Sequence, residues 1–281
     1  MFELISLEPL LHKFTLRETG IDPEDFNAIK HTFDALPEDA YERKLRQIEF
    51  LKRRFPELQE RLGSFLVEYY ASDSALNSIN DLLSKLSPAE RKQFDSMPSS
   101  RRRSISKFVA EEHNSDHSIR LQRVRVGPFS QTYAHGNIPL NLPRVFEESS
   151  YELTEETGFR ALLSILCKEA FAYTNARSMT IVIHQVTTSA TKETPFVLPE
   201  GIHQDGADFI VSAIPIIMEN VDVPASIVYD TEKVPIFTSH LMIGEGLFHD
   251  DKSYWHSVSD LHATADRGRR GTLGFDMRIS Q

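Results

Sequence analysis

Residues 199–208 read PEGIHQDGAD and lead directly into the mostly apolar run 209–217, which has the length and composition of a buried β-strand. On an extended backbone, residues i and i+2 point to the same side, so His203 and Asp205 can direct an imidazole and a carboxylate at one point. Two such ligands hold a metal loosely, and the best candidate for a third is His256. Two histidines and one carboxylate leave other coordination positions open, which is the arrangement of non-haem Fe(II) sites.

Arg270 follows in a short strand-like segment near the C-terminus. An Fe(II) site with open positions commonly needs a co-substrate that chelates the metal. If that co-substrate is 2-oxoglutarate, its far carboxylate needs a planar, bidentate partner, which an arginine supplies. Thr272 shares a face with Arg270 and can donate a hydroxyl hydrogen bond. Arg270 and Thr272 are therefore the predicted co-substrate residues.

With these residues in place, the chain resembles the iron- and 2-oxoglutarate-dependent dioxygenases that hydroxylate free amino acids, the group typified by bacterial isoleucine dioxygenase. The resemblance covers roughly residues 125 to 278. It is carried by Phe129-Ser130-Gln131-Thr132-Tyr133, Ile183-His184-Gln185, Pro199-Glu200-Gly201-Ile202-His203-Gln204-Asp205-Gly206, Asp250-Asp251 ahead of His256, and Arg270 with Leu273.

The resemblance implies that His203, Asp205 and His256 bind Fe(II), and that Arg270 and Thr272 hold 2-oxoglutarate. With O2 as the second co-substrate, such an enzyme oxidises an unactivated C–H bond of a free L-amino acid or a close derivative and releases succinate and CO2. The outcome is hydroxylation, ring closure or desaturation, depending on how the substrate is held. A role in natural product biosynthesis is the corresponding expectation.

The same resemblance places the substrate pocket along the strands that carry Gln131, Arg144, His184 and Gln185, with Arg125 as a rival to Arg144. Two departures from the family pattern concern the substrate. The family often has an arginine shortly after its His-Gln pair, where this chain reads VTT at 186–188, and a Gly-Gly pair where this chain reads DVPAS at 222–226. We therefore expect a preference other than isoleucine.

Asp250 and Asp251 have two readings. They can orient a ligand histidine from outside the metal's own ligand set, or they can form a plain acidic turn. Arg101-Arg102-Arg103 also has two readings, a solvated or salt-bridged face and an anion-binding patch, of which we favour the first.

Short strands separated by Pro, Gly and Asp turns predict an α+β fold with a double-stranded β-helix (jelly-roll, cupin-like) core over residues 119–281. Residues 1–118 are predicted to be a helical N-terminal region packed on that core, either as a buttress or as a lid or dimer surface. One predicted helix starts at Asp22 and a second runs from Pro37 until Pro56. Further predicted helices are 72–86, 87–97, 99–112 and 155–175, and the predicted strands are 179–186, 209–218, 226–229, 235–243, 246–249 and 271–279.

Composition limits the other possibilities. A formal net charge of −10 disfavours a nucleic-acid partner. No run approaches the roughly 20 apolar residues needed to cross a bilayer, and no secretory signal is recognisable, so we expect a cytoplasmic protein without a membrane partner. The single cysteine, Cys167, excludes an intramolecular disulfide and is expected to be a small buried hydrophobe. Whether the chain forms a homodimer is left open.

Two rival functions remain at this point. The first is a non-catalytic jelly-roll protein that binds a small carboxylate or acts as a scaffold. The second is a zinc hydrolase that uses the same three ligands, which would need a nearby general base and would give Arg270 no role.

Overall fold

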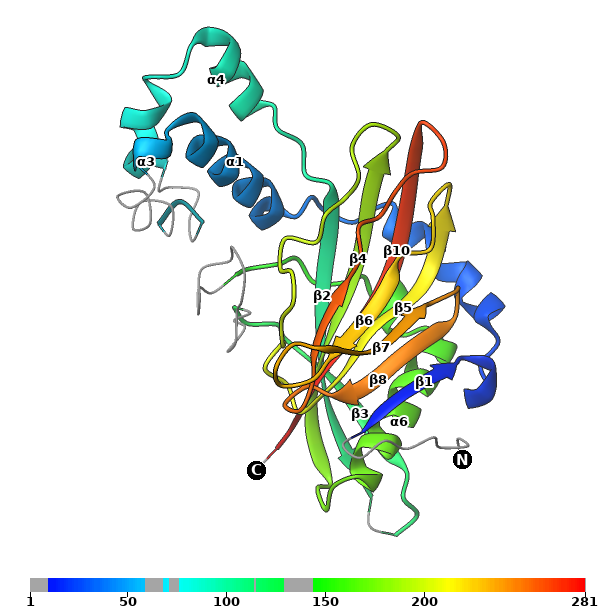
Figure 1. Cartoon of the computed structure of the whole chain (residues 1–281). Helices are drawn as coiled ribbons and strands as arrows, with labels where there is room; N and C mark the ends of the chain where they lie inside the picture. The colour runs from blue at the N-terminus through cyan, green and yellow to red at the C-terminus, as the bar shows by residue number, and fades with distance from the viewer. Residues whose placement is uncertain (1–9, 59–67, 71–75, 114, 129–143, 281) are drawn as a thin grey trace.

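The computed structural model describes residues 10–58, 68–70, 76–113, 115–128 and 144–280, and two antiparallel sheets dominate this part of the chain (Figure 1). The larger sheet has seven strands in the order β1-β8-β5-β10-β4-β2-β3, and the smaller has three in the order β7-β6-β9. The strands are β1 (Leu11–Thr15), β2 (Arg101–Glu112), β3 (Ile119–Val124), β4 (Ser178–Thr191), β5 (Phe209–Glu219), β6 (Ala225–Tyr229), β7 (Pro235–His240), β8 (Glu245–Asp250), β9 (Trp255–Val258) and β10 (Arg267–Ile279).

A hydrophobic cluster and a cavity that adjoins it at Ala213 both include residues of the two sheets. The cluster joins Leu11, Ala213 and Leu247 of the large sheet to Val228 of the small one. The strands around the cavity are mainly β4, β5 and β10 on one side and β6 and β9 on the other. This arrangement, with a large antiparallel sheet and a few helices, confirms the predicted jelly-roll, cupin-like fold.

Helices cover the outer face of the large sheet. The helix α6 (Thr157–Ala172) begins at Glu156, whose side chain accepts from the N–H of Phe159. Its buried residues, among them Phe159, Leu163 and Cys167, recur at helical spacing and pack into the main core. Cys167 is therefore the buried apolar residue that the sequence predicted. The shorter elements are η1 (Arg17–Thr19), η2 (Pro23–Phe33), η3 (Pro56–Leu58) and α5 (Tyr151–Thr154).

Three helices, α1 (Ala40–Arg54), α3 (Leu76–Leu83) and α4 (Pro88–Asp95), form a separate group beyond one end of β2 (Figure 1). They have a hydrophobic core of their own, which includes Leu51 and Phe94. Asp39 caps α1 by accepting from two backbone N–H groups, and Ser87 and Glu90 form a capping box at the start of α4.

The helix predicted over residues 99–112 is wrong, because this segment is strand β2. It pairs with β4 from Arg101 to Glu111 and with β3 from Lys107 to Glu112. Strand β1 also precedes residue 118 and pairs with β8. The N-terminal part of the chain is thus helical only in part, and it contributes two strands to the large sheet.

Within the described residues, no helix is both long enough and apolar enough to span a membrane.

Candidate metal centre and its cavity

His203 and His256 are held side by side by their backbones. The N–H of His203 donates to the carbonyl of His256 at 3.0 Å, and the N–H of His256 donates back at 2.9 Å. The two ring centroids lie 4.2 Å apart. Asp205 completes the group, with its carboxylate oxygens 3.8 Å from His203 Nε2 and 3.4 Å from His256 Nε2. One ligand atom from each residue lies within 4.8 Å of the others, so the structure brings together the three residues that the sequence selected.

The tautomer of His203 follows from its second nitrogen. Its Nδ1 lies 3.0 Å from the carbonyl oxygen of Gly201, and a carbonyl can only accept, so in the neutral ring Nδ1 carries the proton and Nε2 keeps its lone pair. Gly201 has a φ of 63°, in the left-handed region that glycine enters without strain. The turn at Gly201 therefore presents Nε2 of His203 to the triad, as a metal ligand requires.

Asp251 supports the loop that carries Asp205. Its carboxylate accepts from the backbone N–H groups of Asp205 at 3.2 Å, Gly206 at 2.7 Å and Ala207 at 3.0 Å. Burial and the charge of Asp205 raise the pKa of Asp251 to about 7. Asp250, by contrast, accepts from the N–H groups of Lys252 and Ser253 and closes a turn. The turn reading therefore holds for Asp250. Asp251 supports the loop of Asp205, and its Oδ1 lies 3.8 Å from His256 Nδ1, which is too far for a hydrogen bond.

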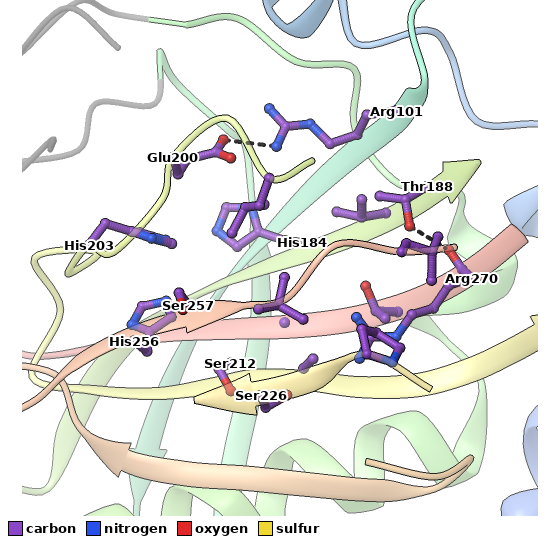
Figure 2. Close-up of a pocket in the computed structure, with 18 of the residues that line it drawn as sticks. Arg101, His184, Thr188, Glu200, His203, Ser212, Ser226, His256, Ser257 and Arg270 are labelled. Carbon is purple, nitrogen blue, oxygen red and sulfur yellow. Dashed lines mark hydrogen bonds and ion pairs between the residues drawn. The ribbon is translucent and has the colours of Figure 1, made fainter. Parts of the chain in front are cut away.

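A cavity of about 170 Å³ opens beside the triad, and Arg270 lines it from β10 (Figure 2). Arg270 is buried, and its Nε and Nη2 have no hydrogen-bond partner among the described residues. Burial lowers the pKa of Arg270 to about 10. Thr272 and Thr188 line the same wall. A buried guanidinium without an anion is costly, so this wall suits the carboxylate of a small ligand.

A second charged wall comes from β2 and from the loop ahead of His203. Arg101 Nη1 donates to Glu200 Oε1 at 2.8 Å, a pair drawn with a dashed line in Figure 2. Two residues along β2, Arg103 Nη2 lies 2.6 Å from His184 Nδ1. Because a guanidinium can only donate, Nδ1 of His184 is the acceptor, and its protonated Nε2 faces Asp276 Oδ2 at 3.0 Å. Burial and the charge of Arg103 hold the pKa of His184 well below its usual range, so the ring is neutral.

The predicted substrate residues differ in where they lie relative to the cavity. His184 lines the cavity. Gln185 does not, because it faces the helical layer, where its Nε2 donates to Thr32 Oγ1 at 2.8 Å. Arg144 is buried near Phe146 and is absent from the cavity wall, and Gln131 lies outside the described residues. The rival Arg125 is exposed.

Sequence reasoning missed Arg101, Arg103 and Glu200. The i, i+2 spacing of Arg101 and Arg103 was the available signal, since on a strand it places both on one face. Arg102, between them, is exposed, whereas Arg101 and Arg103 are 4% and 9% exposed. The preferred reading of the three arginines was a solvated or salt-bridged face. Arg102 is exposed and Arg101 is salt-bridged, but Arg101 and Arg103 are not solvated, because both are buried in the cavity wall.

Comparisons with known proteins show the family and the fold. The model of the family described as 2OG-Fe dioxygenase matches residues 90–276. Among solved structures, a bsmA homolog from Methylobium petroleophilum PM1 superposes with a TM-score of 0.66 at 16% identity, covering 96% of this chain and 88% of that one. IDO from Bacillus thuringiensis gives a TM-score of 0.52 at 16% identity, covering 72% of this chain and 92% of that one. At such identities these two likenesses show the fold alone. No curated protein matches the sequence.

Proposed function

Because the chain belongs to the 2OG-Fe dioxygenase family, whose members use Fe(II), 2-oxoglutarate and O2, we propose that it oxidises an unactivated C–H bond of a free L-amino acid or a close derivative. The observation that carries the proposal is the pairing of a His-Asp-His triad with a buried, uncompensated arginine on the wall of one cavity.

In this proposal His203, Asp205 and His256 hold Fe(II). Nitrogen and carboxylate donors in this number suit that ion and leave positions open for co-substrate and O2. The available Nε2 lone pair of His203 and the support of Asp251 for the Asp205 loop fit the same role. When bound, Fe(II) would let O2 act as the oxidant, and 2-oxoglutarate would take up one oxygen atom of O2 as it is converted to succinate and CO2.

Arg270 and Thr272 are proposed to hold the far carboxylate of 2-oxoglutarate. The two Arg270 nitrogens without partners give it the donors for a charge-assisted contact, and Thr188 and Thr272 place hydroxyl groups on the same wall. Because Arg270 is buried, its contact with the anion would be stronger than a contact in bulk water.

The amino-acid substrate is supported by the charges on the other wall. Arg101, Arg103 and Glu200 present both signs of charge next to the metal triad, which suits a small zwitterion better than an apolar ligand. His184 is proposed to help position the substrate from the cavity wall, and Arg144 to favour its carboxylate through charge.

An anaerobic titration tests the core of the proposal. Fe(II) followed by 2-oxoglutarate should give the visible metal-to-ligand charge-transfer band in the wild type and no band in His203→Ala. Free amino acids are then screened for succinate release. A band without release by any free amino acid would retain the oxygenase and reject the substrate class. Absence of iron binding would favour the carboxylate-binding scaffold, and hydrolysis with zinc but no iron-dependent turnover would favour the hydrolase.

A further inference from the structure

Arg101 and Glu200 form a buried ion pair in which one polar atom of each side chain has no hydrogen-bond partner among the described residues. They are 4% and 6% exposed and lie on the wall of the cavity. Arg101 Nη2 and Glu200 Oε2 have no hydrogen-bond partner within the described part of the chain. Two residues that line the cavity therefore carry one unsatisfied donor and one unsatisfied acceptor, each on a buried charged group.

Further charged side chains surround the Arg101–Glu200 ion pair. Arg101 forms ion pairs with two carboxylates. Glu200 is one, and Asp39 is the other, with its Oδ2 accepting from Arg101 Nε at 2.7 Å. Arg103 adds a further cation on the same face of β2. Burial, and after it repulsion from Arg101 and Arg144, lower the pKa of Arg103 to about 10, against the opposing charges of Asp39 and Glu200. An anion bound here relieves that repulsion, while Glu200 still favours a cation close by.

The remainder of the cavity near Glu200 is apolar. Phe196 and Leu261 belong to a small hydrophobic cluster against which Leu198 packs, and all three line the cavity. A ligand with a charged head at Arg101 and Glu200 thus has an apolar surface for its remaining atoms. His203 lies three residues after Glu200, so such a ligand is held next to the metal triad.

We infer that Arg101 and Glu200 bind the head group of an α-amino acid with an apolar side chain, and that this pair selects the zwitterion. The carboxylate accepts from Arg101 Nη2 and is drawn by Arg103, and the ammonium donates to Glu200 Oε2. This inference rests on the proposed function and names the residues that would distinguish a free amino acid from its blocked derivatives.

The decisive variant is Glu200→Gln. It keeps an oxygen for Arg101 but replaces the ionised acceptor, so the KM for a free amino acid should rise about 10- to 100-fold, the usual weight of a hydrogen bond to a charged group. Glu193→Gln, at an exposed position in the same loop, is the matched control and should leave KM unchanged. Thermal-shift titration with the same ligands gives a binding readout that does not depend on turnover.

The probes are valine, leucine, isoleucine, methionine and phenylalanine, each as the free acid, the N-acetyl derivative and the amide. The wild type should prefer the free form, and Glu200→Gln should lose most of its discrimination against the N-acetyl form. Arg101→Lys should lose discrimination against the amide. If Arg101→Lys does not fold, Glu200→Gln still decides.

The charge-transfer band separates two kinds of failure. If the wild type gives no charge-transfer band, the proposed function itself is refuted. A band in both proteins, with equal KM values and equal head-group preference in wild type and Glu200→Gln, would overturn only the role of this pair. Binding of N-acetyl forms in preference to free forms by the wild type would overturn it as well.

Discussion

Arg101 Nε donates to Asp39 Oδ2 at 2.7 Å, and this contact joins the wall of the cavity to the first turn of α1. The other carboxylate oxygen of Asp39 accepts from the N–H groups of Tyr41 and Glu42, which caps the helix. Asp39 is 1% exposed. One buried carboxylate therefore serves both the separate helical group and the charged wall beside the metal triad.

Replacing Asp39 should cost much more than a helix cap. Asp39→Ala removes the cap, worth about 1 kcal/mol, and also leaves Arg101 buried with one partner fewer, for which a total loss of about 3–5 kcal/mol is expected. Urea unfolding gives the comparison with Ser87→Ala, which removes only the cap of α4. Equal losses in the two variants would mean that the Asp39–Arg101 contact contributes nothing to stability.

Arg270→Met should change stability and ligand binding in opposite directions. Without ligand, the variant should be about 1–3 kcal/mol more stable, because a buried guanidinium without an anion is replaced by an apolar side chain of similar length. Its affinity for 2-oxoglutarate should fall about 100-fold.

Thermal unfolding with and without 2-oxoglutarate measures both effects of Arg270→Met. At 100 times its Kd the ligand should stabilise the wild type by about 2.7 kcal/mol and the variant hardly at all. Arg269→Met is the control, since Arg269 pairs with Glu219 and Asp34 outside the cavity and should alter stability by less than about 1 kcal/mol. Full 2-oxoglutarate stabilisation in Arg270→Met would disprove its assignment.

His256→Ala should remove Fe(II) binding while the fold survives. The pairing of residues 203 and 256 uses backbone groups, which an alanine retains. Iron content after anaerobic loading and gel filtration should therefore fall to background, with a circular dichroism spectrum like that of the wild type. His262→Ala, at an exposed position, should load normally. Normal loading of His256→Ala would require a different third ligand.

His249 should make the metal-free protein sensitive to acid. Burial lowers the pKa of His249 to about 4 from 6.5, so below pH 6.5 the unfolded chain takes up a proton that the folded chain does not. Stability is then lost as pH falls from about 6.5 towards 4, by up to about 3 kcal/mol from this residue.

His249→Phe removes that titration and should lose less stability than the wild type between pH 7 and pH 4.5. Urea unfolding of chelator-treated protein at the two pH values measures the difference. His262→Phe, at an exposed position, should retain the pH dependence of the wild type. An unchanged pH dependence in His249→Phe would show that His249 is not kept neutral by burial.

The sequence predicted those candidate site residues whose spacing along the chain fixes the relative orientation of their side chains. His203 and Asp205 are two apart at a strand entrance, and Arg270 and Thr272 are two apart on a strand, so local geometry alone orients each pair. His256 was identified by residue type rather than by distance. Its backbone pairing with residue 203 is a long-range feature that no local pattern encodes.

The error at β2 has a physical cause. One face of this strand places Arg101 and Arg103 in the cavity wall, and its next residues, Ser104 to Ser106, are buried on both faces. The usual alternation of apolar and polar residues is therefore missing, and a serine followed by charged residues resembles a helix start. The error over Gln185 was avoidable, because His184 and Gln185 are adjacent on one strand and must face opposite sides.

The proposed co-substrate and substrate residues lie on different elements of the chain, although they line one cavity. Strand β10 lies between β5 and β4 and carries Arg270, whereas Arg101 lies on β2 and Glu200 on a loop. If the first residue serves the co-substrate and the other two the substrate, mutations can alter substrate choice without disturbing the central strand. A mutant library limited to the β2 and loop positions is then the economical route to new substrates, because every member inherits the same oxidising centre.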